Sequence, residues 1–339
     1  MWDELKAKTR PLVLYGTGNA AEKILKELDI RDIRVSGIFA SDGFVRDRSF
    51  AGFKVLSYEE AKAKFGPMTV LLCFGSHRPE VIENIVKIAS EQDLYAPDLP
   101  IAGEGLFDRE FYEAHKAELD WVRERLADDR SRLVFDNVIE YKLTGRIEPL
   151  LDCETPEEEN WRLFAPRGSF LDLGAYTGDT VQLFIKLFGA DCGIIAVEPE
   201  ERNFRKLTEN TEGLKNIRLV HAAVGDRSGM VPFTHGAGRG GAAEKGKVRP
   251  VRLETVDSLL KGADVGIIKM DLEGAESQAI RGAENTIRHC RPSMLISAYH
   301  RTEDLFAIPR QVLAIASDYR LFLRKDPCIP AWGVNYFFV

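Results

Sequence analysis

The stretch FLDLGAYTGDT at residues 170–180 decides how the second half of this chain folds. Residues 170–173 have the short, mostly apolar pattern of a buried strand, and a helical pattern begins at Thr180. The turn between them carries Gly174 and Gly178, which lack a Cβ and therefore let the backbone turn sharply beside a bound molecule. Open α/β sheets bind ligands outside the carboxyl ends of their strands. The stretch therefore predicts such a sheet, with a binding site at residues 174–179.

Strand and helix patterns continue to alternate from this stretch to residue 339. The further strand patterns lie at residues 193–197, 217–221, 265–270, 293–299, 320–324 and 333–339. The helical patterns lie at residues 180–187, 201–210, 275–287 and 308–315. Seven strands with an adjacent pair at the end predict an open, doubly wound sheet with one antiparallel strand. We assign residues 151–339 to this domain.

A smaller Rossmann-like, doubly wound domain is predicted at residues 1–103. Its strand patterns lie at residues 12–15, 33–40 and 69–74, and helical patterns follow through Leu28, at 58–65 and at 79–89. Strands that alternate with helices predict parallel βαβ units. Residues 104–150 predict a helical connector of two amphipathic helices, with a charged break at residues 128–130.

Composition excludes several classes of protein. A chain of 339 residues has room for roughly two domains. The net charge of −7 argues against a nucleic-acid binder, which needs clustered positive charge. No apolar run approaches the roughly 18 residues of a transmembrane segment, and the acidic start Met1-Trp2-Asp3-Glu4 does not resemble a signal peptide, so we expect a cytoplasmic protein. The five cysteines form no C-x-x-C pair, which argues against a cysteine zinc site. Whether the chain forms a homo-oligomer stays open.

Two carboxylates near the glycine turn indicate what it binds. A dinucleotide loop reads G-x-G-x-x-G, but Tyr176 stands where the second glycine should be. Asp172, two residues before Gly174, would repel a pyrophosphate and attract a cationic amino-acid ligand such as the α-ammonium group of S-adenosylmethionine. Glu198 ends the next strand, where a carboxylate accepts hydrogen bonds from ribose hydroxyls. Asp172 and Tyr176 together favour S-adenosylmethionine over a nicotinamide cofactor.

The third strand of this sheet ends at residues that suit an adenine ring. Ala222 and Ala223 are small and apolar, and Asp226 either reaches the exocyclic amine or is a turn residue. The predicted cofactor site comprises Asp172, Gly174, Ala175, Tyr176, Thr177, Gly178, Asp179, Glu198, Pro199, Ala222, Ala223, Asp226 and Asp271.

Three residues at the ends of the fourth and fifth strands are candidates for catalysis. Asp271 comes too early to cap the following helix, whereas Glu273 and Glu276 could equally be helix caps. His300 follows the fifth strand and has a side chain suited to taking a proton from a hydroxyl group. We predict Asp271 or His300 as the general base and Glu273 as an orienting residue. Asp271 and Glu273 could also hold Mg²⁺, which the sequence does not require. The glycine-rich residues 236–246 are expected to fold over the acceptor.

These segments resemble the FkbM-type methyltransferases, a branch of the class I S-adenosylmethionine-dependent enzymes. The resemblance covers roughly residues 165–300, and its most specific part is the run KMDLEGAE at 269–276. It implies a seven-stranded methyltransferase sheet and transfer of a methyl group to a hydroxyl group of a small molecule or glycan, often a sugar. The segments that carry it are LDLGAYTGD at 171–179, AVEP at 196–199, AAVGD at 222–226, ETVDSL at 254–259 and IKMDLEGAE at 268–276.

The N-terminal domain supports an alternative hypothesis. Gly16, Gly18 and Ala21 match a relaxed dinucleotide fingerprint, and Asp42 follows 21 residues later. The segment, including residues 52–57, also resembles the small Rossmann-like domains of sugar-modifying proteins. The alternative is therefore a protein that binds a nucleotide sugar or NAD(P) through the Gly16 loop and carries a degenerate transferase domain. The domain could equally be a scaffold. An RNA methyltransferase is disfavoured because a basic, aromatic-rich patch is lacking.

Overall fold

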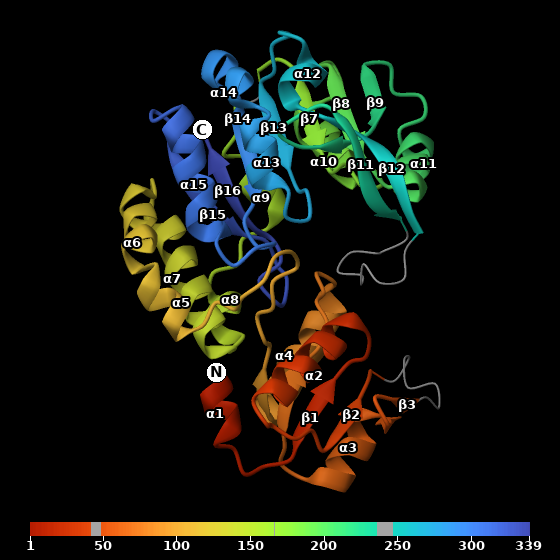
Figure 1. Ribbon diagram of the computed structural model, residues 1–339, viewed down its shortest axis with the longest axis vertical. Coiled ribbons are helices and arrows are strands. Elements are labelled where there is room, and N and C mark those ends of the chain that lie inside the picture. The colour runs from red at the N-terminus through yellow and green to blue at the C-terminus, as the bar shows by residue number, and fades with distance from the viewer. Residues whose placement is uncertain (42–48, 166, 236–246) are drawn as a thin grey trace.

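The computed structural model describes residues 1–41, 49–165, 167–235 and 247–339. They form two α/β domains and a group of helices that lies between the domains in the sequence. Figure 1 shows the N-terminal domain at the bottom and the C-terminal domain at the top, with helices α5, α6 and α7 along the left side of the upper domain. None of the described helices is long and apolar enough to cross a bilayer.

The N-terminal domain contains a six-stranded sheet in the order β3-β4-β2-β1-β5-β6, in which β3 alone pairs antiparallel. Helix α2 packs on one face with the side chains of Leu12 and Leu14, while α3 and α4 pack on the other with Val13 and Tyr15. Successive strand residues point to opposite faces, so the apolar run of β1 serves both layers. The elements are α1 Trp2–Lys6, β1 Leu12–Tyr15, α2 Asn19–Ile30, β2 Gly37–Phe39, β3 Ser49–Phe50, β4 Phe53–Leu56, α3 Tyr58–Phe65, β5 Thr69–Leu72, α4 Pro79–Glu91 and β6 Asp93–Tyr95.

The predicted strand at residues 33–40 was too long, because only Gly37–Phe39 pair with β1. The short strands β3, β4 and β6 were missed, since two to four residues are too few to show a period. Asp42 lies outside the described residues, so its predicted place after β2 has no structural counterpart here.

The connector is helical, but its first half is two helices rather than one. Helix α5 ends at Ala114 and α6 begins at Lys116, with His115 as the cap residue between them. The predicted break provides the N-cap of α7, where Asp128 accepts a hydrogen bond of 2.8 Å from the Ser131 amide. Helix α7 packs on strand β15 of the C-terminal domain. The elements are α5 Arg109–Ala114, α6 Lys116–Arg125, α7 Asp129–Thr144, α8 Glu148–Asp152 and α9 Glu157–Trp161.

The C-terminal domain confirms the predicted seven-stranded sheet. Its order is β15-β16-β14-β13-β7-β8-β9, and β16 is antiparallel to both of its neighbours. The predicted helix at 275–287 is two helices, since Gly282 lies so close to the Gly225 carbonyl that a Cβ there would be 2.1 Å from its oxygen. The elements are β7 Phe170–Leu173, α10 Asp179–Phe188, β8 Ile194–Glu198, α11 Glu201–Asn210, β9 Ile217–His221, α12 Val256–Leu260, β13 Ile267–Met270, α13 Glu276–Arg281, α14 Glu284–Cys290, β14 Ser293–Ser297, α15 Asp304–Ile315, β15 Leu321–Lys325 and β16 Val334–Phe338.

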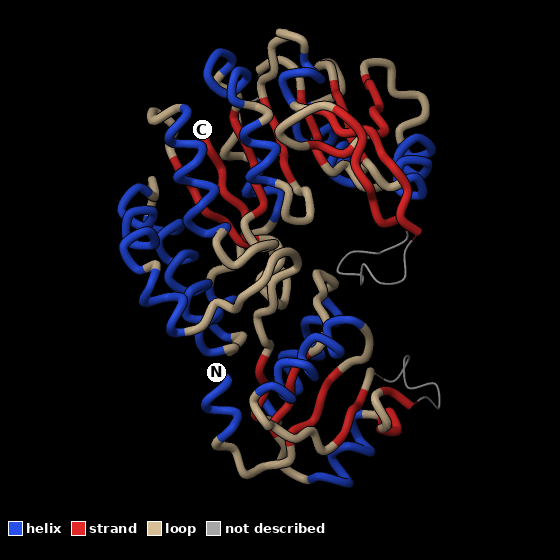
Figure 2. Tube along the Cα trace, in the orientation of Figure 1, coloured by secondary structure: helices blue, strands red, loops and turns tan. Residues whose placement is uncertain are grey.

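A second, three-stranded sheet was not predicted. It consists of β10 Ala223–Val224, β12 Lys247–Glu254 and β11 Gly229–His235, in that order, with β11 and β12 antiparallel. Figure 2 shows this hairpin extending from the upper domain toward the lower one. Residues 236–246, predicted to cover the acceptor, lie outside the described residues.

Candidate active site

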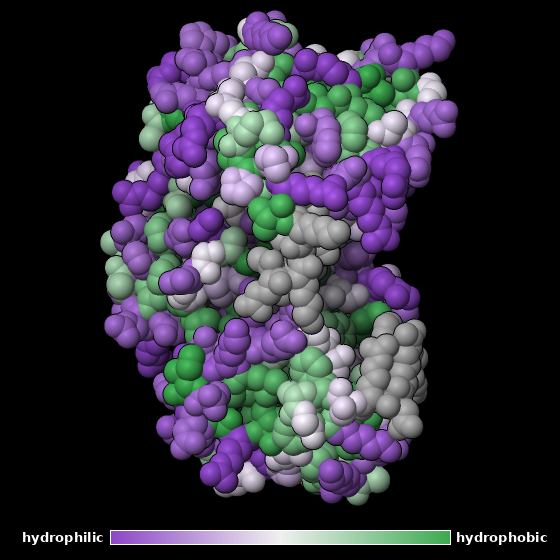
Figure 3. All heavy atoms as spheres, turned by 45° about the vertical axis from the view of Figure 1, so that its right-hand side comes forward, coloured by the Kyte–Doolittle hydropathy of each residue, from purple (hydrophilic) through white to green (hydrophobic). Residues whose placement is uncertain are grey.

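A cleft of about 940 Å³ lies between the two domains. The carboxyl end of β5 contributes Phe74 to one side, and the carboxyl ends of β7, β8 and β13 contribute Tyr176, Glu198 and Asp271 to the other. Figure 3 shows the surface indented where the upper and lower domains meet. The ligand-binding edges of both sheets therefore face one space, which has the size of a ligand pocket.

The glycine turn after β7 packs directly against the end of β13. Gly174 has φ +79°, and a Cβ at this position would lie 1.9 Å from the Asp271 carbonyl oxygen. Gly178, with φ +89°, is the N-cap residue of α10. Glycine is therefore needed at 174, both for the left-handed backbone and for the close approach of the two loops.

Glu198 lies at the end of β8 and joins the glycine turn to the next helix. Its Oε2 accepts a hydrogen bond of 2.9 Å from the Tyr176 amide, and its Oε1 accepts one of 2.9 Å from the Glu200 amide. Burial raises the pKa of Glu198 to about 7, although these hydrogen bonds act in the opposite direction. A carboxylate has about four acceptor positions, so Glu198 retains capacity for hydroxyl donors in the cleft that it lines.

Asp172 is not on the cleft wall. It is fully buried, and Lys269, its partner on strand β13, places Nζ 3.2 Å from its Oδ1. Lys269 also donates a hydrogen bond of 2.9 Å to the Gly174 carbonyl. Burial raises the pKa of Asp172, against the opposing effect of Lys269. Lys269 thus supplies the positive charge beside Asp172 that we expected a bound ligand to bring.

Lys269 was missed by the sequence reasoning. The available signal was a single charged residue inside the otherwise apolar strand of residues 267–270. A charged side chain in a buried parallel strand needs a partner of opposite charge, and Asp172 on the adjacent strand supplies it.

The other predicted cofactor residues divide into three groups. Gly174, Tyr176, Glu198, Pro199, Ala223, Asp226 and Asp271 line the cleft. Ala175, Gly178 and Ala222 are buried behind its wall, whereas Thr177 and Asp179 are not among its lining residues. The Asp226 carboxylate is already paired with Arg281, at 3.1 Å between Oδ2 and Nη2.

The candidate catalytic residues form one cluster at the ends of β13 and β14. Asp271 lines the cleft, and the Tyr299 hydroxyl donates to its Oδ1 at 3.2 Å. His300 is fully buried, with Nε2 3.4 Å from Asp271 Oδ1 and Nδ1 2.9 Å from Glu276 Oε1. The imidazole therefore lies between two carboxylates, of which Asp271 is the one at the cleft.

His300 is poorly suited to act as a base in this arrangement. Burial alone would lower its pKa, but Glu276, Asp271 and Glu273 raise it to about 9. At neutral pH the imidazole is then already protonated. Of the two predicted bases, the geometry favours Asp271.

Glu273 lines the cleft with φ +51°, and its Oε2 lies 3.9 Å from His300 Nε2. Among the described residues, Asp271, Glu276 and His300 form a group with metal-ligand spacing. The second carboxylate of this group is Glu276, whereas the predicted magnesium pair combined Asp271 with Glu273. The protonated imidazole already supplies positive charge between the carboxylates. The arrangement therefore does not favour the predicted magnesium pair.

In the Gly16 loop of the N-terminal domain, Gly16 is closely approached by a side chain, whereas nothing lies within 4 Å of a Cβ position at Gly18. Gly16 has φ +108°, and a Cβ there would lie 2.6 Å from the Phe74 ring. A dinucleotide loop needs its glycines for close approach of a pyrophosphate. Here Gly16 makes room for Phe74.

The C-terminal domain is a methyltransferase domain by its family match, and its fold is a seven-stranded sheet with a glycine turn after the first strand. Residues 172–324 match the family model described as the methyltransferase FkbM domain. Over these residues the C-terminal domain is therefore similar to the FkbM methyltransferase family.

Two similar proteins extend this comparison. The 2-O-methyltransferase NoeI of Sinorhizobium fredii (strain NBRC 101917 / NGR234) is 28% identical over 150 residues, which cover 37% of this chain and 61% of that protein. The crystal structure of methyltransferase FkbM from Methylobacillus flagellatus KT superposes with a TM-score of 0.73 at 21% identity, covering 99% of this chain and 92% of that one. The second likeness shows that both domains share a known fold.

Proposed function

We propose that the protein transfers the methyl group of S-adenosylmethionine to a hydroxyl group of a sugar, a glycoconjugate or a related small molecule. The observation that carries the proposal is the cleft wall on which Glu198 and Asp271 flank the glycine turn. The family match supports methyl transfer, and a relative named as a 2-O-methyltransferase supports oxygen as the acceptor atom.

The residues present fit this donor. Glu198 keeps acceptor capacity for ribose hydroxyls, and Ala223 offers a small apolar surface for the adenine ring. Asp172 acts indirectly, because Lys269 connects its carboxylate to the Gly174 carbonyl and thereby holds the turn. The bound donor supplies a methyl group that its sulfonium charge has already activated.

Asp271 is the proposed general base. The acceptor oxygen forms a bond to the methyl carbon, the carbon–sulfur bond breaks with its electron pair passing to sulfur, and the hydroxyl proton passes to Asp271. Holding the oxygen and carbon in line supplies most of the acceleration, and a base contributes roughly 10²–10⁴-fold. His300 is a positioning residue, which holds Asp271 through its contact at 3.4 Å.

Titration calorimetry with S-adenosylmethionine tests the donor site. We expect Glu198→Gln to weaken binding at least tenfold, because a neutral amide is a weaker acceptor for ribose hydroxyls. Wild-type affinity should also fall as the pH drops below about 7, where Glu198 becomes protonated, while the variant shows a flatter profile.

Glu201→Gln is the matched control, since Glu201 is an exposed neighbour that does not line the cleft. Absence of binding to the wild type, or equal affinity in Glu198→Gln, would contradict the proposed donor site.

A further inference from the structure

The N-terminal domain contributes a wall of unusual composition to the cleft. Among the described residues that it supplies, Lys23 is the single charged one and the others are apolar. Phe74, Leu99 and Ile101 are only partly buried, so they keep apolar surface exposed at this wall. Trp332, from the segment between β15 and β16, lines the same cleft and is also partly exposed.

The opposite wall is mixed, with apolar residues such as Val231 and Leu253 beside its charged ones. It carries Glu198, Asp271 and Glu273, which come from the ends of β8 and β13. A molecule that fills the cleft therefore meets these carboxylates on one side only, whereas the N-terminal side is almost entirely apolar.

Hydrogen bonds between the domains hold the apolar wall beside the catalytic cluster. The Ile101 and Ala102 amides both donate to the His300 carbonyl at 2.9 Å. Ser76 and Ile329 exchange two backbone hydrogen bonds, of 2.8 and 3.1 Å, which attach the β5–α4 loop to the segment that carries Trp332. The wall is therefore placed next to Asp271 by main-chain contacts.

This wall does not suit a phosphate-bearing ligand. Recognition of phosphate in proteins relies on several cationic side chains or backbone amides. The Lys23 ammonium group already donates to the Pro100 carbonyl at 3.1 Å, and Phe74 packs on Gly16. The described part of the domain thus offers apolar contacts where a nucleotide sugar would need charge.

We propose that the N-terminal domain is the acceptor-binding half of the active site. It takes an amphipathic acceptor, whose reactive hydroxyl lies at Asp271 and whose alkyl or aryl portion packs against Phe74, Leu99, Ile101 and Trp332. This inference rests on the proposed methyl transfer. It makes Ile101 and Trp332 specificity-determining residues.

Matched glycosides test the inference. Methyl and octyl glycosides of glucose, galactose and N-acetylglucosamine are titrated, below micellar concentration, into the full chain saturated with S-adenosylhomocysteine. For at least one sugar the octyl glycoside should bind at least tenfold more tightly than the methyl glycoside, because its chain leaves water for the apolar wall. Ile101→Ser should remove most of this gain while leaving the affinity for S-adenosylhomocysteine unchanged.

Ile30→Ser is the control variant, because Ile30 is 75% exposed and does not line the cleft. Trp332→Ala provides a second cleft variant if Ile101→Ser unfolds. Equal affinity for methyl and octyl glycosides, failure of every octyl glycoside to bind, or a gain retained in both cleft variants would overturn the inference. Failure to bind S-adenosylhomocysteine would instead contradict the proposed function.

Discussion

Gly174 shows how strongly one residue can be constrained by its surroundings. It combines φ +79° with a Cβ position 1.9 Å from a backbone oxygen. Gly189 has a similar φ of +87°, but nothing lies within 4 Å of its Cβ position. A comparison of substitutions at the two positions therefore distinguishes the cost of a positive φ from the cost of a steric clash.

We predict that Gly174→Ala lowers the free energy of unfolding by well over about 1 kcal/mol, because the turn must move away from β13. Gly189→Ala should cost less, about 1–3 kcal/mol, from its backbone alone, because φ +87° with ψ 173° is a conformation that glycine adopts far more readily than other residues. Chemical denaturation of both variants measures the difference. Equal losses would show that the approach of Gly174 to Asp271 is not a stability constraint.

His300 makes a second prediction at this scale. His300→Gln should lower kcat and move the lower pH limit of activity upward, because removal of a positive charge makes Asp271 easier to protonate. Asp271→Asn should lower kcat roughly 10²–10⁴-fold without weakening donor binding. His289→Gln, an exposed histidine outside the cluster, is the control for the pH profile.

The same charge links His300 to stability. A folded-state pKa of about 9, above the ordinary 6.5, stabilises the fold below pH 6.5, and this contribution is lost as the pH rises to 9.

For the activity prediction, a pH profile of activity that is unchanged in His300→Gln would contradict the positioning role of His300.

The sequence allowed us to predict which residues end at the binding edge more readily than the contacts that each of them makes. Asp271 and Glu198 could be predicted because residues that end parallel strands share one edge of a sheet. Asp172 is two strand positions deeper than Glu198 and Asp271, and the sequence does not show that Lys269 meets it there. Pairing across strands depends on register, which is a property of the folded sheet.

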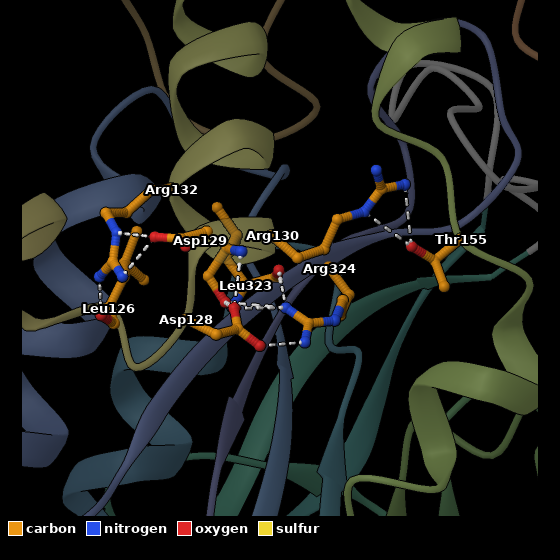
Figure 4. Close-up of polar contacts among 9 residues, drawn as sticks. Leu126, Asp128, Asp129, Arg130, Arg132, Thr155, Leu323 and Arg324 are labelled. Carbon is orange, nitrogen blue, oxygen red and sulfur yellow. Dashed lines mark hydrogen bonds and ion pairs between the residues drawn. The ribbon is translucent and has the colours of Figure 1, made fainter.

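At the scale of elements, helix α7 is attached to strand β15 by an ion pair. Figure 4 shows the Arg324 guanidinium facing the Asp128 carboxylate, with Nη1 to Oδ1 at 3.2 Å and Nη2 to Oδ2 at 2.6 Å. The Ser131 hydroxyl also accepts hydrogen bonds from Arg324 and from the Leu323 amide. The connector is thereby joined to the edge of the C-terminal sheet.

We predict that Asp128→Ala destabilises the protein by about 1–3 kcal/mol, since it leaves Arg324 mostly buried without its carboxylate. Asp129→Ala is the control, because Asp129 pairs with Arg132 at the exposed surface. Thermal unfolding of both variants compares them, and equal melting temperatures would contradict a joining role for Asp128.

This ion pair also has an expected pH dependence. Burial alone would raise the pKa of Asp128, but Arg324 and Ser131 hold it at about 2. Its stabilising contribution is present above the ordinary pKa of 3.8 and is lost as the pH falls to 2.

Elements with local signals were predicted well. Helix α3 begins with a capping box between Ser57 and Glu60, and its bounds agree with the sequence pattern. The division between α13 and α14 could not be predicted, because it depends on Gly282 approaching the Gly225 carbonyl. The β11–β12 hairpin was missed since its stability comes from pairing between strands, and not from an apolar period within either one.

At the scale of the whole molecule, the two larger sheets were predicted, the N-terminal one without its short strands, but their mutual placement was not. The two binding edges face each other because Ile101 bonds to His300 and Ser76 bonds to Ile329. These contacts join residues that are about 200 or more positions apart in the sequence, so no local sequence pattern indicates them. The shared cleft is consequently a finding of the structure, and the proposal that the N-terminal domain binds the acceptor depends on it.

A crystal structure of the full chain with S-adenosylhomocysteine tests the central claim most directly. The account predicts ribose hydroxyls within hydrogen-bonding distance of Glu198 and the sulfur atom directed toward Asp271. A ligand bound at the Gly16 loop, or absent from the cleft at saturating concentration, would contradict it.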